Sequence, residues 1–283
     1  MARQRLGQHF LSDPGWREKI ARAIGFFPYG MTGFPSSGSR DYCWIEVGAG
    51  HGEMTEHLVR SGAPVYAIEL DPRLVERLER LAREHSNLTI IPGDVLETDL
   101  RAIASAGRIR LYGNLPYYIT SPILHHLFGY ADLIDEIHVV IQLEVAQRLT
   151  ARPGSRSYGY LSVVTQFYTH PEFALRLPRG AFRPPPEVGS GLVTLRLPGE
   201  RAKLAIQADD DFLTFVKTCF SHKRKTLSNN LRDIAGPQHT RSLLRELNLR
   251  EDVRAEQLGV AELAAVYQSI SSAMPRAGRD NRT

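Results

Sequence analysis

Short apolar runs alternate with segments of helical spacing between about residues 43 and 150, and this alternation constrains the fold more than any other feature of the sequence. The runs are rich in the β-branched and large apolar residues that favour strands. They are Cys43–Val47, Val65–Leu70, Leu88–Ile91, Ile109–Tyr112 and Ile137–Gln142. In one intervening segment Leu74, Leu78 and Leu81 have helical spacing, and Asp71-Pro72 supplies a typical N-cap and first helical residue. Strands that alternate with helices build a mostly parallel sheet covered on both faces, so we expect an α/β fold.

The pattern changes after about residue 201. Before that point we expect two further strands, over Leu161–Tyr168 and Leu192–Leu197. Beyond it, apolar residues recur at helical spacing in several segments, for example at Leu243, Leu244 and Leu247. The sequence therefore predicts a first domain over residues 1–201, a small helical domain over 202–272 and a polar, flexible tail over 273–283.

Composition limits where the protein works. The chain has 283 residues, of which 42% are hydrophobic, so it can bury a core. Its two cysteines, Cys43 and Cys219, are far apart and outside any metal-ligand spacing, so we expect neither a disulfide framework nor a metal site. No apolar stretch has the length of a signal peptide or a membrane span. We expect a soluble, monomeric protein of the cytoplasm with no membrane partner.

A glycine-rich turn follows the first predicted strand. Gly48, Gly50 and Gly52 are spaced G-x-G-x-G, whereas the dinucleotide-binding fingerprint is G-x-G-x-x-G. Glycine lets a ligand approach the backbone closely, and the helix start that follows has free N–H groups. The spacing disfavours a nicotinamide cofactor, and we expect Gly48 and Gly50 to contact a different ligand.

Carboxylates end the next two predicted strands. Glu69 closes the second strand and can accept hydrogen bonds from both hydroxyls of a ribose. Asp71 can do the same, but it is better explained as the cap of the following helix. Asp94 follows the third strand and can accept from an adenine amino group, although an isolated aspartate here is more often a turn residue. Together these positions predict a pocket for an adenosine-bearing ligand at the carboxyl edge of the sheet.

The segment Asn114-Leu115-Pro116-Tyr117 follows the fourth predicted strand. Its composition suits methylation of an amine on an aromatic ring, such as adenine N6, whose lone pair is delocalised into the ring. The amide oxygen of Asn114 and the backbone carbonyl of Leu115 can accept hydrogen bonds from the amine and orient it. Pro116 fixes the turn, and Tyr117 offers a ring on which an unstacked base can lie.

The same four residues have a plainer explanation. An isolated segment of this kind is equally well a proline-centred turn with tyrosines packed on the core. Its place after a strand, with the glycine turn and Glu69 upstream, favours the catalytic interpretation. The basic cluster Ser221–Lys225 also has two explanations, since it can meet phosphates or form a solvated face.

These motifs, in this order, resemble those of the ribosomal RNA adenine N6-dimethyltransferases. The resemblance extends from about residue 3 to residue 270. It covers Gly7–Leu11, Glu46–Gly52, Ile68–Asp71, Gly93-Asp94, Asn114–Tyr117, Gln142–Leu149, Tyr158–Val163, Ala181–Val188 and Lys223–Leu231. It implies an α/β fold with a Rossmann-like class I methyltransferase sheet and a small C-terminal helical domain. Ala181–Val188 and Lys223–Leu231 favour the bacterial small-subunit branch, in which two adjacent adenines near the 3′ end of 16S rRNA are dimethylated.

The resemblance also implies a cofactor, a partner and residue roles. The cofactor is S-adenosyl-L-methionine, and the partner is 16S rRNA within a precursor of the 30S subunit. Gln8, His9 and Leu11 are implied to line the cofactor site, together with Gly48, Gly50, Glu69, Asp94 and Asn114. Phe182 is implied to lie near the target base, although a core position explains it equally well. Lys223, Arg224 and Lys225 are implied to bind RNA. Family members often have Asn where this chain has His9 and Tyr118.

Three other functions share parts of the pattern. One is methylation of a 23S rRNA adenine by the related resistance-type enzymes, which share the cofactor motifs. Another is RNA binding in ribosome assembly or transcription by a protein that kept the fold and lost its activity; the intact Asn114–Tyr117 and Glu69 argue against this. The third is a nicotinamide-dependent oxidoreductase, which the glycine spacing disfavours. The fold alone does not separate them.

Overall fold

The computed structural model describes residues 9–25, 42–103 and 107–273, which fall into two compact units. The first unit holds the described residues up to Gln147 together with Pro171–Leu197. The second holds Arg148–His170 and the described residues from Pro198 onward. A single cut at residue 201 would leave Arg148–His170 in the first unit, whereas the contacts place this segment in the second.

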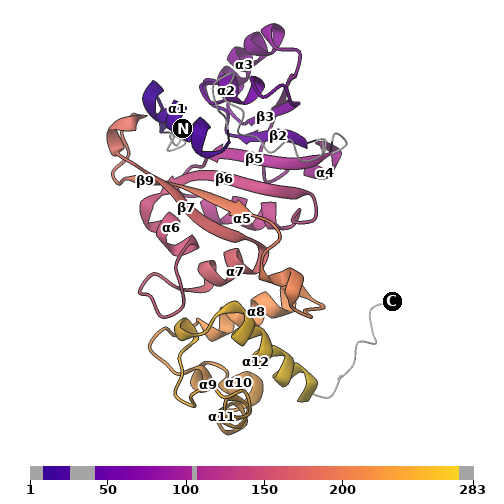
Figure 1. Ribbon diagram of the computed structural model, residues 1–283, viewed down its shortest axis with the longest axis vertical. Coiled ribbons are helices and arrows are strands. Elements are labelled where there is room, and N and C mark those ends of the chain that lie inside the picture. Colours follow the sequence, from indigo (N-terminus) through magenta and orange to yellow (C-terminus); the bar gives the residue numbers. More distant parts are fainter. Residues whose placement is uncertain (1–8, 26–41, 104–106, 274–283) are drawn as a thin grey trace, which may run out of the picture. The chain divides into compact units, whose positions relative to one another are not determined.

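A seven-stranded sheet with the order β4-β3-β2-β5-β6-β9-β7 forms the centre of the first unit (Figure 1). Its strands are β2 (Tyr42–Val47), β3 (Val65–Glu69), β4 (Leu88–Pro92), β5 (Arg108–Asn114), β6 (Ile134–Gln142), β7 (His170–Leu177) and β9 (Ser190–Arg196). The five strands from β4 to β6 run parallel, and β9 is antiparallel to β6. All five strands predicted from the alternating pattern belong to this parallel part, which confirms the α/β assignment.

Helices α2 to α5 connect the parallel strands of the first unit, α1 precedes them and α6 follows β6. These helices are α1 (Pro14–Ala23), α2 (Thr55–Val59), α3 (Pro72–Glu84), α4 (Leu100–Ile103), α5 (Thr120–Phe128) and α6 (Leu143–Leu149), the last of which ends beyond Gln147. The predicted start of α3 is confirmed, because the Asp71 side chain accepts a hydrogen bond of 3.0 Å from the N–H of Arg73 and Pro72 is the first residue. A capped α3 ends β3 sharply and leaves Glu69 at the edge of the sheet.

One core covers the face of the sheet that carries Trp44 and Tyr112, and both of these side chains are fully buried. Ile20 of α1 and Leu58 of α2 pack in the same cluster. Phe182, in the short strand β8 (Phe182–Arg183), belongs to it too. β8 pairs with the short strand β1 (Phe10–Leu11) in an antiparallel two-stranded sheet. The core therefore ties the amino-terminal segment to residues more than 170 positions later in the chain.

The expected strand over Leu161–Tyr168 is wrong, because these residues form helix α7 (Tyr160–Tyr168) in the second unit. The run contains β-branched and aromatic residues that favour a strand, but its polar residues Ser162, Thr165 and Gln166 have the i, i+3, i+4 spacing of a helix. Two local hydrogen bonds favour the helix. The Ser162 hydroxyl accepts from the N–H of Gly159 at 3.1 Å, and the Thr165 hydroxyl donates to the carbonyl of Leu161 at 2.7 Å.

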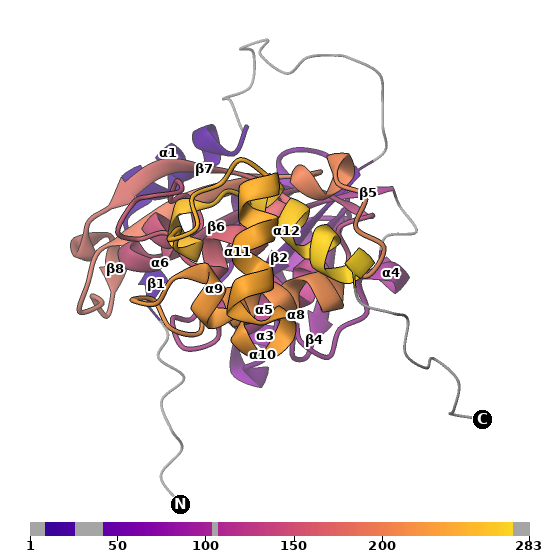
Figure 2. The ribbon, with the colours of Figure 1, turned by 90° about the horizontal axis from the view of Figure 1, so that it is seen from below.

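The rest of the second unit is helical, with α8 (Asp209–Cys219), α9 (Leu227–Asn230), α10 (Arg232–Ala235), α11 (Pro237–Glu246) and α12 (Val260–Ala273). Helices α9, α10 and α11 gather beside one another, as both ribbon views show (Figures 1 and 2). The Phe212 ring of α8 lies 5.0 Å from Phe167 of α7 and 5.5 Å from Tyr267 of α12. These aromatic contacts join the three helices. Among the helices that the structure describes, none is long and apolar enough to cross a membrane.

Candidate cofactor and substrate site

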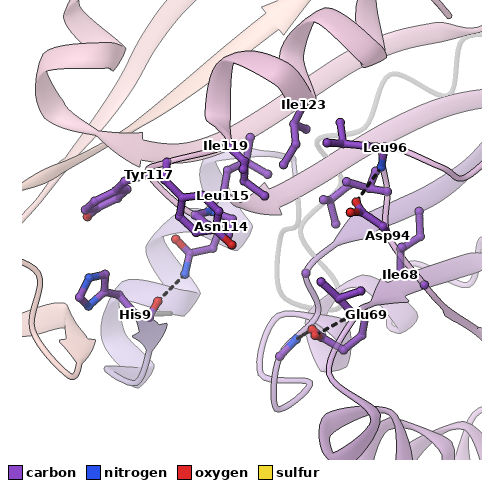
Figure 3. Close-up of a pocket in the computed structure, with 18 of the residues that line it drawn as sticks. His9, Ile68, Glu69, Asp94, Leu96, Asn114, Leu115, Tyr117, Ile119 and Ile123 are labelled. Carbon is purple, nitrogen blue, oxygen red and sulfur yellow. Dashed lines mark hydrogen bonds between the residues drawn. The ribbon is translucent and has the colours of Figure 1, made fainter. Parts of the chain in front are cut away.

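A pocket opens in the first unit at the carboxyl edge of the sheet, where β2, β3, β4 and β5 end (Figure 3). Its empty volume is about 1060 Å³, including the mouth. Its lining residues are His9, Phe10, Val47, Gly48, Gly50, Ile68, Glu69, Leu70, Gly93, Asp94, Val95, Leu96, Asn114, Leu115, Pro116, Tyr117, Tyr118, Ile119 and Ile123.

The glycine turn forms one wall of the pocket. Gly48 and Gly50 have φ angles of +69° and +61°, which residues other than glycine rarely adopt. A Cβ on Gly48 would point into open space, with no atom within 4 Å, whereas one on Gly50 would come within 3.2 Å of the Phe10 ring. The bare backbone at Gly48 therefore leaves space for a ligand, and Gly50 leaves space for Phe10.

Glu69 is the last residue of β3 and is only 3% exposed. Its Oε2 accepts a hydrogen bond of 2.8 Å from the N–H of Gly50, and its Oε1 accepts from the N–H groups of Leu70 and Asp71, each at 2.9 Å. A carboxylate has about four acceptor positions. These three bonds fix the carboxylate beside the glycine turn and leave one position on Oε2 for a ligand hydroxyl.

Asp94 lines the pocket beyond the end of β4 and also serves as a turn residue. Its Oδ1 accepts a hydrogen bond of 2.9 Å from the N–H of Leu96. Within the described ranges Oδ2 has no hydrogen-bond donor, so it can accept from an amino group of a ligand. The two explanations offered by the sequence are thus compatible, since one oxygen shapes the turn and the other is unused.

Asn114 is the last residue of β5, and its amide has a defined orientation. The side-chain Nδ2 donates a hydrogen bond of 2.8 Å to the backbone carbonyl of His9 (Figure 3). Because the nitrogen is used in this way, the amide oxygen Oδ1 is left as an acceptor. Neither Oδ1 nor the backbone carbonyl of Leu115 receives a hydrogen bond from the part of the chain that the structure describes. The segment Asn114–Tyr117 therefore presents two unused acceptors on neighbouring residues.

Tyr117 is half-buried and is held at its phenolic end. Its hydroxyl oxygen lies 2.9 Å from the hydroxyl oxygen of Ser190, which is fully buried at the start of β9. The Tyr117 ring lies 5.6 Å from the His9 ring, and His9 Nδ1 donates to the carbonyl of Pro184 at 2.8 Å. Burial raises the pKa of the Tyr117 hydroxyl, so it stays protonated. Tyr117 thus supplies a neutral ring whose position is fixed from outside its own loop.

A buried carboxyl group lies below the glycine turn. Glu46 of β2 is 2% exposed, and its Oε2 accepts a hydrogen bond of 2.5 Å from the Thr55 hydroxyl. Burial raises the pKa of Glu46 to about 8, and the nearby Glu53 and Glu69 add to the increase. The group is therefore largely protonated at neutral pH, which avoids placing a second negative charge beside Glu69.

Several predicted site residues lie elsewhere. Leu11 and Phe182 are buried partners in the β1–β8 pair and are not among the residues that line the pocket. Gln8 lies outside the described residues. Lys223, Arg224 and Lys225 are exposed in the second unit, where the Lys223 ammonium donates to the carbonyl of Arg156 at 2.9 Å. Lys225 also borders a polar hollow lined in part by His222 and Arg232.

The apolar walls of the pocket were missed from the sequence. Leu70, Val95 and Leu96 each lie within two residues of a predicted carboxylate, so adjacency was an available signal. Phe10 lies within the Gln8–Leu11 segment that the family resemblance implied to line the site, and its ring is tilted 44° to that of His51 with the centroids 4.4 Å apart. Ile119 and Ile123 follow the catalytic segment into α5. Their helical spacing of four residues gave a signal for one shared face.

The donors and acceptors of the pocket fit an adenosine-bearing cofactor. Glu69 has an acceptor for a ribose hydroxyl, Asp94 has one for an amino group, and Gly48 leaves open space beside the backbone. The sheet order and this strand-edge pocket define the class I methyltransferase fold.

Two solved structures share this fold. A dimethyladenosine transferase from Plasmodium falciparum has 22% identity and a TM-score of 0.75, and covers 93% of this chain and 98% of its own. The 23S rRNA methyltransferase ErmE has 23% identity and a TM-score of 0.69, with coverage of 93% and 99%.

The family is defined by sequence. The Ribosomal RNA adenine dimethylase family matches residues 1–272. Two relatives carry the name ribosomal RNA small subunit methyltransferase A. The one from Koribacter versatilis is 34% identical over 94% of this chain and 93% of its own length, and the one from Acidobacterium capsulatum is 39% identical over 94% and 90%. The chain belongs to the ribosomal RNA adenine dimethylase family, whose enzymes use S-adenosylmethionine.

Proposed function

We propose that this enzyme dimethylates N6 of two adjacent adenines near the 3′ end of 16S rRNA, within a precursor of the 30S subunit. The observation that carries the amine chemistry is the hydrogen bond from Asn114 Nδ2 to the carbonyl of His9, and the name of the two relatives supports small-subunit rRNA as the substrate. The hydrogen bond fixes the amide so that Oδ1 accepts, as an amine substrate requires. The same proposal places the enzyme in the cytoplasm, because bacterial ribosomes are assembled there. We propose that it acts as a monomer.

Two acceptors orient the amine. In the first transfer Asn114 Oδ1 and the Leu115 carbonyl each accept one N6 hydrogen, which draws the nitrogen lone pair out of conjugation with the ring. In the second transfer the monomethylated amine has one hydrogen, which one of the two acceptors receives. The base lies against Tyr117 after leaving its own stack. Glu69 and Asp94 hold the cofactor by its ribose and its adenine, and the bound cofactor supplies a methyl group attached to a positively charged sulfur. Positioning provides most of the rate increase. The methylated nitrogen then loses a proton to water, so no side chain has to act as a strong base.

Leu11 and Phe182 support this site from the core. Their strands pair Leu11 with Phe182 and Phe10 with Arg183, and the backbone of His9 continues directly from this pair. We propose that these contacts hold the His9 carbonyl at Asn114. Gln8 is proposed to extend the same wall toward the cofactor.

The second unit is proposed to bind the RNA backbone through Lys223, Arg224 and Lys225. All three side chains are exposed, and a phosphate can replace the single carbonyl that Lys223 contacts. Such contacts strengthen binding without reading the sequence, so their effect falls with added salt.

The substrate assignment is tested with labelled S-adenosylmethionine. The protein is incubated with immature 30S particles, naked 16S rRNA or naked 23S rRNA, beside an Asn114→Ala control. Label in adenines of the 16S rRNA supports the proposal. Label in 23S rRNA alone would transfer the chain to the resistance-type activity, and label in neither would leave an RNA-binding role.

A further inference from the structure

We infer that Tyr118 forms a second stacking site at the pocket mouth, which binds the unpaired base next to the target adenine. The inference rests on the proposed function, because the ligand of the site is a neighbouring nucleotide of the same RNA. In a substrate with two adjacent target adenines, that base is the other adenine of the pair.

Exposure singles out Tyr118. Four large apolar side chains of the described residues are well exposed, namely Leu70, Tyr118, Phe173 and Val188. Tyr118 has the highest exposed fraction, at 60%, and it lines the pocket. Within the described ranges, no hydrogen bond, ring contact or cation holds its side chain. An exposed aromatic ring at the mouth of a site offers a large apolar face to a ligand.

Tyr117 and Tyr118 are neighbours in the chain, but their rings are held differently. Tyr117 is half-buried and is fixed through Ser190, so its position is set before substrate arrives. Tyr118 follows it directly, with Cα atoms about 3.8 Å apart. It belongs to a tight turn in which the N–H of Ile119 donates to the carbonyl of Pro116 at 3.2 Å. One ring is therefore half-buried and held by Ser190, and the next is exposed at the pocket mouth on a backbone fixed by the turn.

Nucleic-acid chemistry supplies the occupant. A base that enters the pocket has left its stack, and its neighbour loses a stacking partner at the same time. An aromatic side chain compensates this loss for any base, because every base has a π-face. Tyr118 lies one residue from the ring proposed to bind the target, so it is placed to accept the neighbouring base. Its hydroxyl is not required for stacking, which makes the conservative variant informative.

The test compares Tyr118→Ala, Tyr118→Phe and wild type on immature 30S particles. The control is Phe173→Ala, which removes another exposed aromatic ring that does not line the pocket. Stacking on one ring corresponds to roughly 5- to 150-fold in affinity. We expect Tyr118→Ala to raise the KM for RNA within that range and to leave kcat and the Kd for S-adenosylmethionine within about twofold. Tyr118→Phe and Phe173→Ala should stay within about twofold of wild type in all three constants.

A binding measurement locates the effect. Short single-stranded RNAs carry the target adenine with 2-aminopurine on its 5′ or its 3′ side, and stacking on Tyr118 quenches the emission of one of them. Wild-type quenching that Tyr118→Ala loses and Tyr118→Phe keeps supports the inference. An unchanged KM for Tyr118→Ala, or equal quenching by wild type and Tyr118→Ala, overturns it. Wild type that methylates neither 16S rRNA nor the particles overturns the proposed function instead, so the two failures are distinguishable.

Discussion

The phenolic oxygen of Tyr117 and the hydroxyl oxygen of Ser190 lie 2.9 Å apart, although 73 residues separate them in the chain. Ser190 is fully buried at the start of β9, and Tyr117 belongs to the catalytic segment after β5. The antiparallel end of the sheet thus sets the position of the ring on which the target base is proposed to stack. Ser190 is a positioning residue, since it acts on substrate only through Tyr117.

Removal of this hydrogen bond should reduce turnover moderately. A neutral hydrogen bond contributes about 1 kcal/mol, so Ser190→Ala and Tyr117→Phe should each lower kcat/KM for RNA about fivefold. The Kd for S-adenosylmethionine, measured by calorimetry, should not change. Ser190→Ala made in the Tyr117→Phe background should have no additional effect, because the bond is already lost. Additive losses in this double-mutant cycle would mean that the two hydroxyls act independently.

Asn114→Ala should abolish methyl transfer while cofactor binding stays largely intact. The substitution removes the Oδ1 acceptor for the amine and the Nδ2 donor to His9. Loss of one oriented polar group in an active site typically costs about 10²–10³-fold in kcat. Single-turnover transfer of labelled methyl groups measures the rate, and calorimetry measures the Kd for the cofactor. Normal turnover by this variant would rule out the proposed amine geometry.

Glu69→Ala should weaken cofactor binding. The carboxylate accepts three backbone hydrogen bonds and has one acceptor position left for the ribose. Hydrogen bonds to charged groups contribute about 1.5–3 kcal/mol each, so the Kd should rise about 10- to 150-fold. Asp71→Ala is the control, because it removes a carboxylate two residues away that caps α3. It should lower thermal stability and leave the Kd unchanged. An unaltered Kd for Glu69→Ala would exclude Glu69 from the cofactor site.

Gly50→Ala should impair cofactor binding more than a glycine substitution elsewhere. The new Cβ would lie 3.2 Å from the Phe10 ring, on a backbone with a φ of +61°. Gly62→Ala is the matched control, since Gly62 has a φ of +79° and no atom within 4 Å of a Cβ. Both should lose about 1 kcal/mol of stability from backbone strain. Only Gly50→Ala should also raise the Kd for S-adenosylmethionine, and equal Kd values would show that Phe10 moves away freely.

Stability should decrease with rising pH because of Glu46. Its pKa is raised from 4.5 to about 8 in the folded protein, so folded molecules bind more protons than unfolded ones between these values. Below pH 4.5 this group makes its full stabilising contribution to the free energy of unfolding. It is lost as the pH rises, by up to about 1.4 kcal/mol per pH unit. Glu46→Gln removes this titration. The free energy of unfolding of wild type, measured in urea, should therefore fall relative to that of Glu46→Gln as the pH rises toward 8. Parallel curves for the two proteins would contradict this.

The sequence predicted the parallel strands and the polar residues at the strand ends of the pocket, because both depend on local order along the chain. Carboxyl ends of parallel strands meet at one edge, so Gly48, Glu69, Asp94 and Asn114 had to converge once the strands were recognised. The helix over Tyr160–Tyr168 was missed because its valine and aromatic residues favour a strand, although the polar residues Ser162, Thr165 and Gln166 have helical spacing.

Contacts between distant segments could not be predicted from local patterns. The β1–β8 pair joins Leu11 to Phe182, and no spacing or composition in either segment indicates the other. The support of Tyr117 by Ser190 is of the same kind. These contacts are set by tertiary packing, and they decide the orientation of groups whose identity the sequence already suggested.

A backbone atom, and not a side chain, orients the catalytic amide, since Asn114 donates to the carbonyl of His9. The imidazole at position 9 can therefore be exchanged without loss of that orientation, provided the strand that follows stays in register. Deleting or displacing the amino-terminal residues has the opposite effect. A chain shortened at this end would keep every strand-edge residue but transfer methyl groups slowly, because Asn114 would lose its partner. The position of an amino-terminal affinity tag therefore matters for activity.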